Sequence, residues 1–208
     1  MTRVVKRVSV LGCVLIVAVL AGGAFRSAPS AQASSFTTIF SNLGTGGTVY
    51  NCCAGWSVSG SSSANTDQFW NANAFTPAAD AEITRIDVAI GNLSGTNGVT
   101  LQLATDSGGV PGTVLRTWHL TGLPAFGTCC TLDTTGTAVF VHQSQQYWLV
   151  ALPAAGDTYD AWNVAPTDGT GPVKSNEAGT GWVTFGSTQG AFDVIGIACP
   201  SGARCFGS

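Results

Sequence analysis

The stretch Glu82–Ile90 (EITRIDVAI) decides the fold class that we predict for this chain. Ile86, Val88 and Ile90 recur at every second position, which is the period of a β-strand that buries one of its faces. Ile83 is out of phase with these three residues, and the shift of phase between them predicts a β-bulge. The stretch therefore predicts an irregular, half-buried strand.

Further short runs with the same period follow, separated by clusters of turn-forming residues. Val99–Leu103 alternates strictly, and we expect Thr100 and Gln102 to face water. The other strands are expected at 68–75, 114–120, 138–142, 147–152, 159–164, 182–185 and 191–198, with turns at 92–98, 106–112, 134–136 and 168–172. No segment has helical periodicity over more than two turns, and parallel strands would need helical crossovers. We therefore expect an all-β fold, an antiparallel β-sandwich of jelly-roll-like form.

The N-terminal 33 residues have the layout of a secretory signal peptide. Three basic residues precede an apolar run at 8–24, and the small residues of Ala31-Gln32-Ala33 suit cleavage. A membrane anchor is the alternative, but the run is short for a bilayer and no basic cluster follows it. We expect residues 1–33 to be removed and the mature protein to be secreted, without attachment to a membrane.

The expected mature chain is acidic. Its four basic residues (Arg85, Arg116, Lys174 and Arg204) stand against eleven acidic ones, which gives a formal net charge of −7. Four scattered cations cannot neutralise a phosphate backbone, so we do not expect nucleic acid as a partner. For the same reason, we do not expect binding to an anionic membrane surface.

Six cysteines remain after cleavage, an even number in an exported chain, so we expect three disulfides and no free thiol. Cys199 and Cys205 bracket a short loop that can close locally. The vicinal pairs Cys52-Cys53 and Cys129-Cys130 then most simply cross-link to each other. Two vicinal disulfide rings and a zinc site of four thiolates are the alternatives, although paired C-C lacks the C-x2-C spacing usual for zinc.

Composition divides the mature chain into an arm and a domain. Residues 34–64 are rich in Ser, Gly and Thr, and we expect a loosely held N-terminal arm that Cys52 and Cys53 tie down. The predicted strands at 68–198 place the β-sandwich domain at residues 65–208. The expected disulfides would cross-link the arm to the β-sandwich domain.

Two segments carry a family resemblance: the strand–turn–strand unit around Asp106–Gly112 (DSGGVPG) and the strand Tyr147–Val150 (YWLV). Together with Ile83–Ile90, Trp162-Asn163 and Gly190–Gly196, they resemble exported bacterial β-sandwich domains, including those of choice-of-anchor and PEP-CTERM-type surface proteins. The chain departs from that group in its two CC pairs and in having no C-terminal anchor motif. The resemblance implies a β-sandwich, export and a binding or structural role, and it implies no activity.

Asp106 opens a tight double turn. The glycines that follow it permit positive φ angles, and Pro111-Gly112 suits a second turn. Carboxylate and carbonyl oxygens are also the ligands of calcium, so Asp106 is the candidate metal residue of the sequence. A single carboxylate favours a plain turn, and we expect no cofactor.

Few residues suit enzyme chemistry. His119 and His142 are the two histidines, both on expected strand faces that meet water, and neither a G-x-S-x-G nor an H-E-x-x-H motif occurs. Paired carboxylates for glycoside hydrolysis would meet only in the fold. The candidates for such pairs are Asp157 with Asp160 and Asp168 with Glu177. We expect a protein that is not an enzyme.

Six tryptophans are more than a core of this size needs, and two of them have polar neighbours. Trp162 and Trp182 stand among Asp, Asn, Thr and Gly, where an exposed indole can stack on a sugar ring while polar groups bind its hydroxyls. The predicted ligand-binding residues are Trp162, Asn163, Trp182 and Asp160, with the two indoles near each other at one end of the sandwich. The alternative is that both indoles pack beneath loops.

These expectations combine into a secreted, non-catalytic β-sandwich protein that binds carbohydrate or another extracellular surface component. A structural or cell-envelope interaction protein with no small ligand is the alternative. An unrecognised secreted hydrolase is the less favoured one. The sequence predicts neither the ligand nor the oligomeric state.

Overall fold

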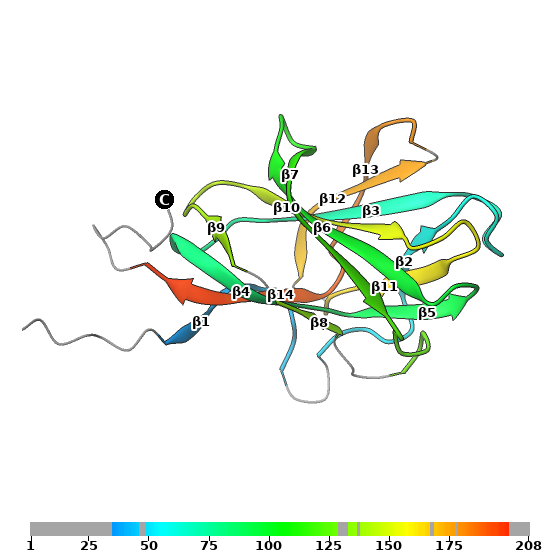
Figure 1. Cartoon of the computed structure of the whole chain (residues 1–208), viewed down its shortest axis with the longest axis horizontal. Coiled ribbons are helices and arrows are strands. Elements are labelled where there is room, and N and C mark those ends of the chain that lie inside the picture. Colours follow the sequence, from blue (N-terminus) through cyan, green and yellow to red (C-terminus); the bar gives the residue numbers. More distant parts are fainter. Residues whose placement is uncertain are drawn as a thin grey trace, which may run out of the picture. The chain divides into compact units, whose positions relative to one another are not determined.

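The computed structural model describes residues 35–45, 49–128, 133–136, 138–166, 169–177 and 179–199. The chain divides into two units, Met1–Ala33 and Ser34–Ser208, and the first of these lies outside the described residues. Every regular element in the described part is a β-strand (Figure 1), and no helix there could cross a membrane.

The strands form two antiparallel sheets. The five-stranded sheet has β14 (Phe192–Ala198) between β1 (Phe36–Ser41) and β4 (Ala81–Val88). The far edge of β4 pairs with two short strands, β8 (Asp133–Thr135) and β9 (Val139–Val141). In Figure 1, β1, β14 and β4 lie together below the long strand β3.

The nine-stranded sheet carries the candidate site. Its order is β5 (Ile90–Ser94), β11 (Tyr159–Asn163), β2 (Gly55–Ser59), β3 (Phe69–Phe75), β10 (Tyr147–Pro153), β6 (Gly98–Asp106) and β7 (Pro111–Thr121). Two further strands, β12 (Thr170–Glu177) and β13 (Trp182–Thr188), branch from it, because β12 pairs with β3 on one side and with β13 on the other.

One apolar core lies between the two sheets. On β6, Val99, Leu101 and Leu103 are fully buried and alternate with half-buried polar residues, as the sequence predicts. Phe192 and Val194 of β14 enter the same core from the other sheet. The alternation of each strand thus places one apolar face of each sheet against the other.

The predicted bulge in β4 is confirmed. Ile195 of β14 pairs with Arg85, but the next residue, Gly196, pairs with Ile83, so Thr84 is the extra residue. The bulge lets Ile83 and Ile86 both enter the core although they are three residues apart.

Two expectations about the chain's organisation were wrong. Segment 34–64 is not a loose arm, because it supplies β1 and β2, which pair with β14 and β11. Ile39 and Val58 anchor these strands in the core, so two apolar residues suffice where backbone pairing supports them. The expected turn at 168–172 runs into β12, which the sequence did not reveal because β12 buries Ser175 and Asn176 instead of apolar side chains.

Candidate functional site

Trp162 is a core residue, so the predicted sugar platform on it was wrong. Its indole is fully buried, lies in edge contact with the ring of Phe192, and donates a hydrogen bond of 3.0 Å from Nε1 to the carbonyl oxygen of Ala191. The reason is the position of β11 between β2 and β5 inside the sheet. An interior strand has no free edge, and this face of it belongs to the core.

Asp160 and Asn163, the predicted polar partners of Trp162, are buried with it. Asp160 Oδ1 accepts a hydrogen bond of 2.8 Å from Asn92 Nδ2, and Asn163 Nδ2 donates one of 3.0 Å to the carbonyl oxygen of Ala89. Burial at this level requires such pairing. Both side chains hold neighbouring strands together instead of meeting a ligand.

Trp182 and Trp162 lie on opposite faces of the nine-stranded sheet. Trp182 is half-buried and packs on a small apolar cluster that includes Ala72, Trp148 and Val150. Trp162 belongs to the core cluster on the other side, so the two indoles do not meet as predicted.

Asp106 serves the turn and the strand beside it. Its Oδ2 accepts from the backbone N–H of Gly109, and its Oδ1 accepts from Trp148 Nε1 and Gln146 Nε2, both at 2.7 Å. Partial burial acts to raise the pKa of Asp106, but these donors outweigh it and lower the pKa. The hydrogen bonds to these three donors give the carboxylate a structural role in the turn. No group of three metal-binding side chains occurs among the residues that the structure describes.

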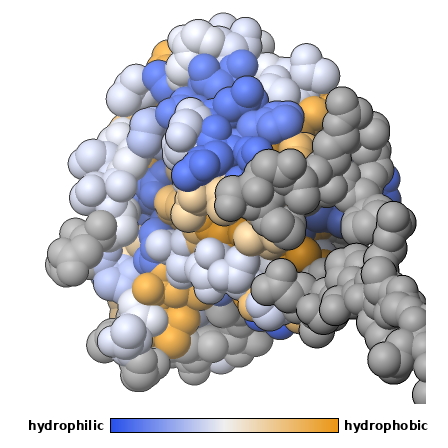
Figure 2. Space-filling view, turned by 90° about the vertical axis from the view of Figure 1, so that its left-hand side faces the viewer, coloured by the Kyte–Doolittle hydropathy of each residue, from blue (hydrophilic) through white to orange (hydrophobic). Residues whose placement is uncertain are grey.

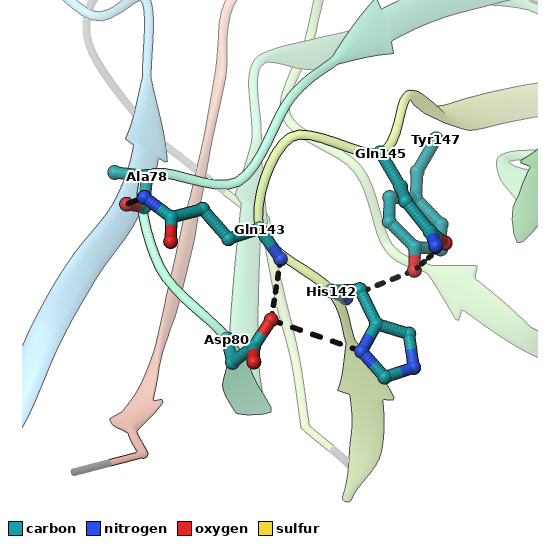
Figure 3. A network of polar contacts seen from close by, with 6 residues as sticks. All are labelled: Ala78, Asp80, His142, Gln143, Gln145 and Tyr147. Carbon is teal, nitrogen blue, oxygen red and sulfur yellow. Dashed lines mark hydrogen bonds and ion pairs between the residues drawn. The ribbon is translucent and has the colours of Figure 1, made fainter. Parts of the chain in front are cut away.

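His142 takes part in a surface network at one end of the sheets (Figure 3). Its Nδ1 lies 3.7 Å from Asp80 Oδ1, and both side chains are about half exposed. The carboxylate also accepts a hydrogen bond of 2.7 Å from the backbone N–H of Gln143, and the backbone N–H of His142 donates to Tyr147 Oη. These contacts join the β3–β4 and β9–β10 loops, and none of them brings a nucleophile to the imidazole ring.

Figure 2 shows this end of the molecule, where hydrophilic surface (blue) covers the upper part and apolar areas (orange) are small and separate.

The other histidine, His119, is exposed on β7, and its Nδ1 lies 3.1 Å from Thr100 Oγ1. Of the carboxylates proposed as hydrolytic pairs, Asp168 lies outside the described residues and Asp160 is buried. No predicted pair therefore forms a described hydrolytic site.

Cys53 is a free, exposed thiol, which differs from the expectation that every cysteine pairs. Its backbone N–H donates a hydrogen bond of 3.0 Å to Asn51 Oδ1, which fixes a tight turn at the vicinal pair. Adjacent side chains point in different directions, so one partner segment does not readily reach both sulfurs. Cys129, Cys130 and Cys205 lie outside the described residues.

The aromatic pocket is a concave site that combines ring faces with polar groups. It holds about 220 Å³ and lies between β2 and β13, over the core-facing side of β3. Its lining residues are Gly55, Trp56, Ser57, Phe69, Asn71, Ser175 and Phe185. Two pairs of consecutive strands, β2 with β3 and β12 with β13, therefore build one pocket from segments about 100 residues apart.

Trp56 and Phe185 form one wall of the aromatic pocket. Their ring centroids are 4.9 Å apart at an interplanar angle of 76°, an edge-to-face contact, and Phe185 is 52% exposed. Trp56 Nε1 donates a hydrogen bond of 2.8 Å to the carbonyl oxygen of Thr188, which fixes the indole against β13. Gly186 leaves room for this approach, because a Cβ there would lie 3.3 Å from the indole ring, closer than side chains usually come.

The rest of the lining is polar and uncharged. Asn71 is nearly fully buried, and its Oδ1 accepts a hydrogen bond of 3.0 Å from Asn73 Nδ2, which sets the orientation of its amide. Ser175 Oγ lies 3.4 Å from the carbonyl oxygen of Trp70. The pocket thus offers aromatic faces, one oriented amide and two serine hydroxyls, with no charged side chain among its described lining residues.

The sequence does not predict this pocket, although it carries one signal of it. The alternation at 68–75 places Phe69 and Asn71 on one face of β3 and Trp70 on the other. The contact between β2 and β13 joins Trp56 to Thr188, which is 132 positions away in the sequence, so no local pattern predicts it.

A scan against protein-family models found no match to this chain, and a search of curated proteins found no relative. The resemblance described above therefore stays a prediction. The functional conclusion therefore rests on the geometry of the aromatic pocket.

Proposed function

We propose that this protein is a secreted, non-catalytic carbohydrate-binding protein and that the aromatic pocket holds one uncharged sugar unit. The observation that carries the proposal is the convergence of Trp56, Phe69 and Phe185 with the oriented amide of Asn71 in one hollow. Carbon-bound hydrogens on a sugar ring pack against aromatic faces, while its hydroxyls need donors and acceptors at fixed positions.

Size and charge narrow the ligand class. Pockets for drug-sized ligands measure roughly 300–1,000 Å³, so a hollow of about 220 Å³ suits a single ring and not an oligosaccharide. The described lining has no cation to pair with a sugar acid and no anion to pair with an amino sugar. A neutral hexose or pentose, free or at the end of a chain, fits these conditions.

The proposal includes the export route and a stapled fold. We assign the two sheets to a β-sandwich of jelly-roll type, which the shared core between them supports. The signal-peptide layout of residues 1–33 supports secretion. Export and the spacing of the cysteines support a link from Cys52 to the Cys129-Cys130 pair and one between Cys199 and Cys205.

Binding of neutral monosaccharides by the secreted protein tests the proposal. We expect a glycan array to show reproducible binding to glycans that end in a neutral sugar. Phe185→Ala should weaken this binding at least about tenfold, because it removes one wall of the pocket. The loss should have little effect on the melting temperature, since Phe185 is 52% exposed.

Val183→Ala is the matched control. Val183 is 59% exposed on the same strand as Phe185 but does not line the pocket, so its variant should bind sugars like the parent protein. Equal binding by Phe185→Ala and the parent would contradict the proposed site. No binding to any glycan would favour a structural or envelope interaction protein without a small ligand.

A further inference from the structure

The face of the nine-stranded sheet that is turned away from the core carries a row of side chains that includes two tryptophans. Trp182 on β13 pairs with Asn176 on β12, and Asn176 pairs with Trp70 on β3. Directly opposite residues in a sheet project from the same face, so both indoles stand on one side with Asn176 between them. The aromatic pocket lies on the other side, because Phe69 and Asn71 alternate with Trp70.

The row continues across three more strands. Trp70 and Leu152 line one hollow of about 230 Å³, together with Gln68 and the loop glycines Gly60 and Gly156. Beyond it, Leu152 of β10 pairs with Thr100 of β6, and Thr100 pairs with His119 of β7. The sequence Trp182, Asn176, Trp70, Leu152, Thr100 and His119 therefore crosses six strands in register.

A firm layer lies beneath this row. Trp148 is completely buried among the small side chains of Ala72, Ala74 and Ala104, and its indole is held by Asp106. The amide of Asn176 in turn accepts a hydrogen bond of 3.3 Å from the backbone N–H of Gly181, which positions the turn before Trp182. Both half-buried indoles thus rest on positions that the fold already fixes.

The charge on this face is low. Lys174 lies one row away on β12, where its Nζ donates a hydrogen bond of 2.8 Å to Thr184 Oγ1. The row itself contains two indoles, an amide, an apolar side chain, a hydroxyl and one imidazole. Such a surface suits neither a strongly anionic nor a strongly cationic polymer.

We propose that this row binds an extended, uncharged, β-linked polysaccharide chain that runs across the strands. Neighbouring strands lie about 4.8 Å apart, so Trp70 and Trp182 stand about 10 Å apart, and the whole row spans about 24 Å. Indoles at that separation stack on every second sugar ring of an extended chain. The hollow between Trp70 and Leu152 receives a further ring, and Thr100 and His119 meet hydroxyls at the far end.

The inference takes its ligand class from the proposed function, but it uses other residues on the opposite face. One molecule would then hold a polymer on this row and a terminal sugar in the aromatic pocket. Two independent sites let a monomer join two glycan chains, and simultaneous engagement raises the apparent affinity for a polysaccharide network.

Calorimetric titration with linear hexasaccharides tests the row. The probes are cellohexaose, xylohexaose and β-1,4-mannohexaose, added to the secreted protein and to its Trp70→Leu and Trp182→Leu variants. Leucine keeps apolar burial but has no flat face, so each variant should bind the preferred hexasaccharide at least about tenfold more weakly. Phe185→Ala, in the aromatic pocket, should leave this affinity within about twofold of the parent value.

The outcomes separate the two sites. Loss of hexasaccharide binding in the Trp70 and Trp182 variants supports the row, even if no monosaccharide binds the pocket. Loss only in Phe185→Ala overturns the row and leaves the pocket standing, and failure of the parent protein to bind any of the three probes also overturns the row. Thermal unfolding verifies that each variant is folded, and Trp182→Leu on the edge strand decides the test if Trp70→Leu does not fold.

Discussion

At the scale of residues, Asp87 and Asp193 place two carboxyl groups side by side. They are directly opposite each other on β4 and β14, and Arg85 Nε lies 3.1 Å from Asp87 Oδ2. Burial and the neighbouring Asp87 carboxylate raise the pKa of Asp193 to about 6. The guanidinium of Arg85 opposes this rise without cancelling it.

This pair predicts a dependence of stability on pH. A raised pKa means that the folded state holds its proton more tightly than the unfolded chain, where an aspartate titrates near 4. The contribution of Asp193 to stability is therefore complete below about pH 4 and is lost as the pH rises through about 6. Asp193→Asn removes the repulsion, and because the site is partly solvated we expect a gain of about 1–2 kcal/mol at pH 7.5.

Urea unfolding of the parent and of Asp193→Asn at intervals from pH 4 to pH 8 measures the effect. The difference in unfolding free energy between the two proteins should grow over this range and level off above pH 7. A variant that is less stable than the parent at pH 7.5, or a difference that does not change with pH, would refute the coupling.

At the scale of elements, β11 shows how an interior strand fixes the role of its tryptophan. Trp162 pairs with Trp56 on one side and with Ile90 on the other, and its indole projects from the face of the sheet that packs on the core. Gly190 makes room for it, because a Cβ at that position would lie 2.6 Å from the ring. Strand order thus decides burial where local composition does not.

Trp162→Ala should lower the free energy of unfolding by about 3–5 kcal/mol through the cavity that it leaves. Sugar binding to the molecules that remain folded should be unchanged, because Trp162 lines neither of the proposed sites. Urea unfolding and a sugar titration at low temperature measure the two effects. A well-folded variant that no longer binds sugar would restore the platform that the sequence predicted on this residue.

The strands also show which structural features a local sequence pattern can predict. The strict alternation of β6 and the phase shift of β4 predict the strand and the bulge, because each depends on neighbours in sequence. β12 follows no apolar alternation, since Asn176 serves a turn and Ser175 lines the aromatic pocket. β1 and β2 are strands because distant partners supply their hydrogen bonds.

At the scale of the whole molecule, the two proposed sites occupy opposite faces of the sheet at β3. Phe69 and Asn71 line the aromatic pocket on one face of β3. Trp70 projects from the other face, where it belongs to the row that crosses six strands. The sequence predicts that Trp182 lies near Trp162, whereas Trp182 shares its face of the sheet with Trp70. Only the order of the strands in the sheet decides that pairing, and strand order comes from contacts across the whole chain.

The central claim is that the aromatic pocket at Trp56 binds a neutral sugar, and the indole N–H resonances of the ¹⁵N-labelled protein test it most directly. The spectrum has one such signal for each tryptophan, and Trp56→Phe assigns that of Trp56 by its absence. Titration with neutral monosaccharides should shift the Trp56 signal in a saturable way and leave that of the core residue Trp162 in place. If no neutral monosaccharide shifts the Trp56 signal up to solubility-limited concentrations, the claim is wrong.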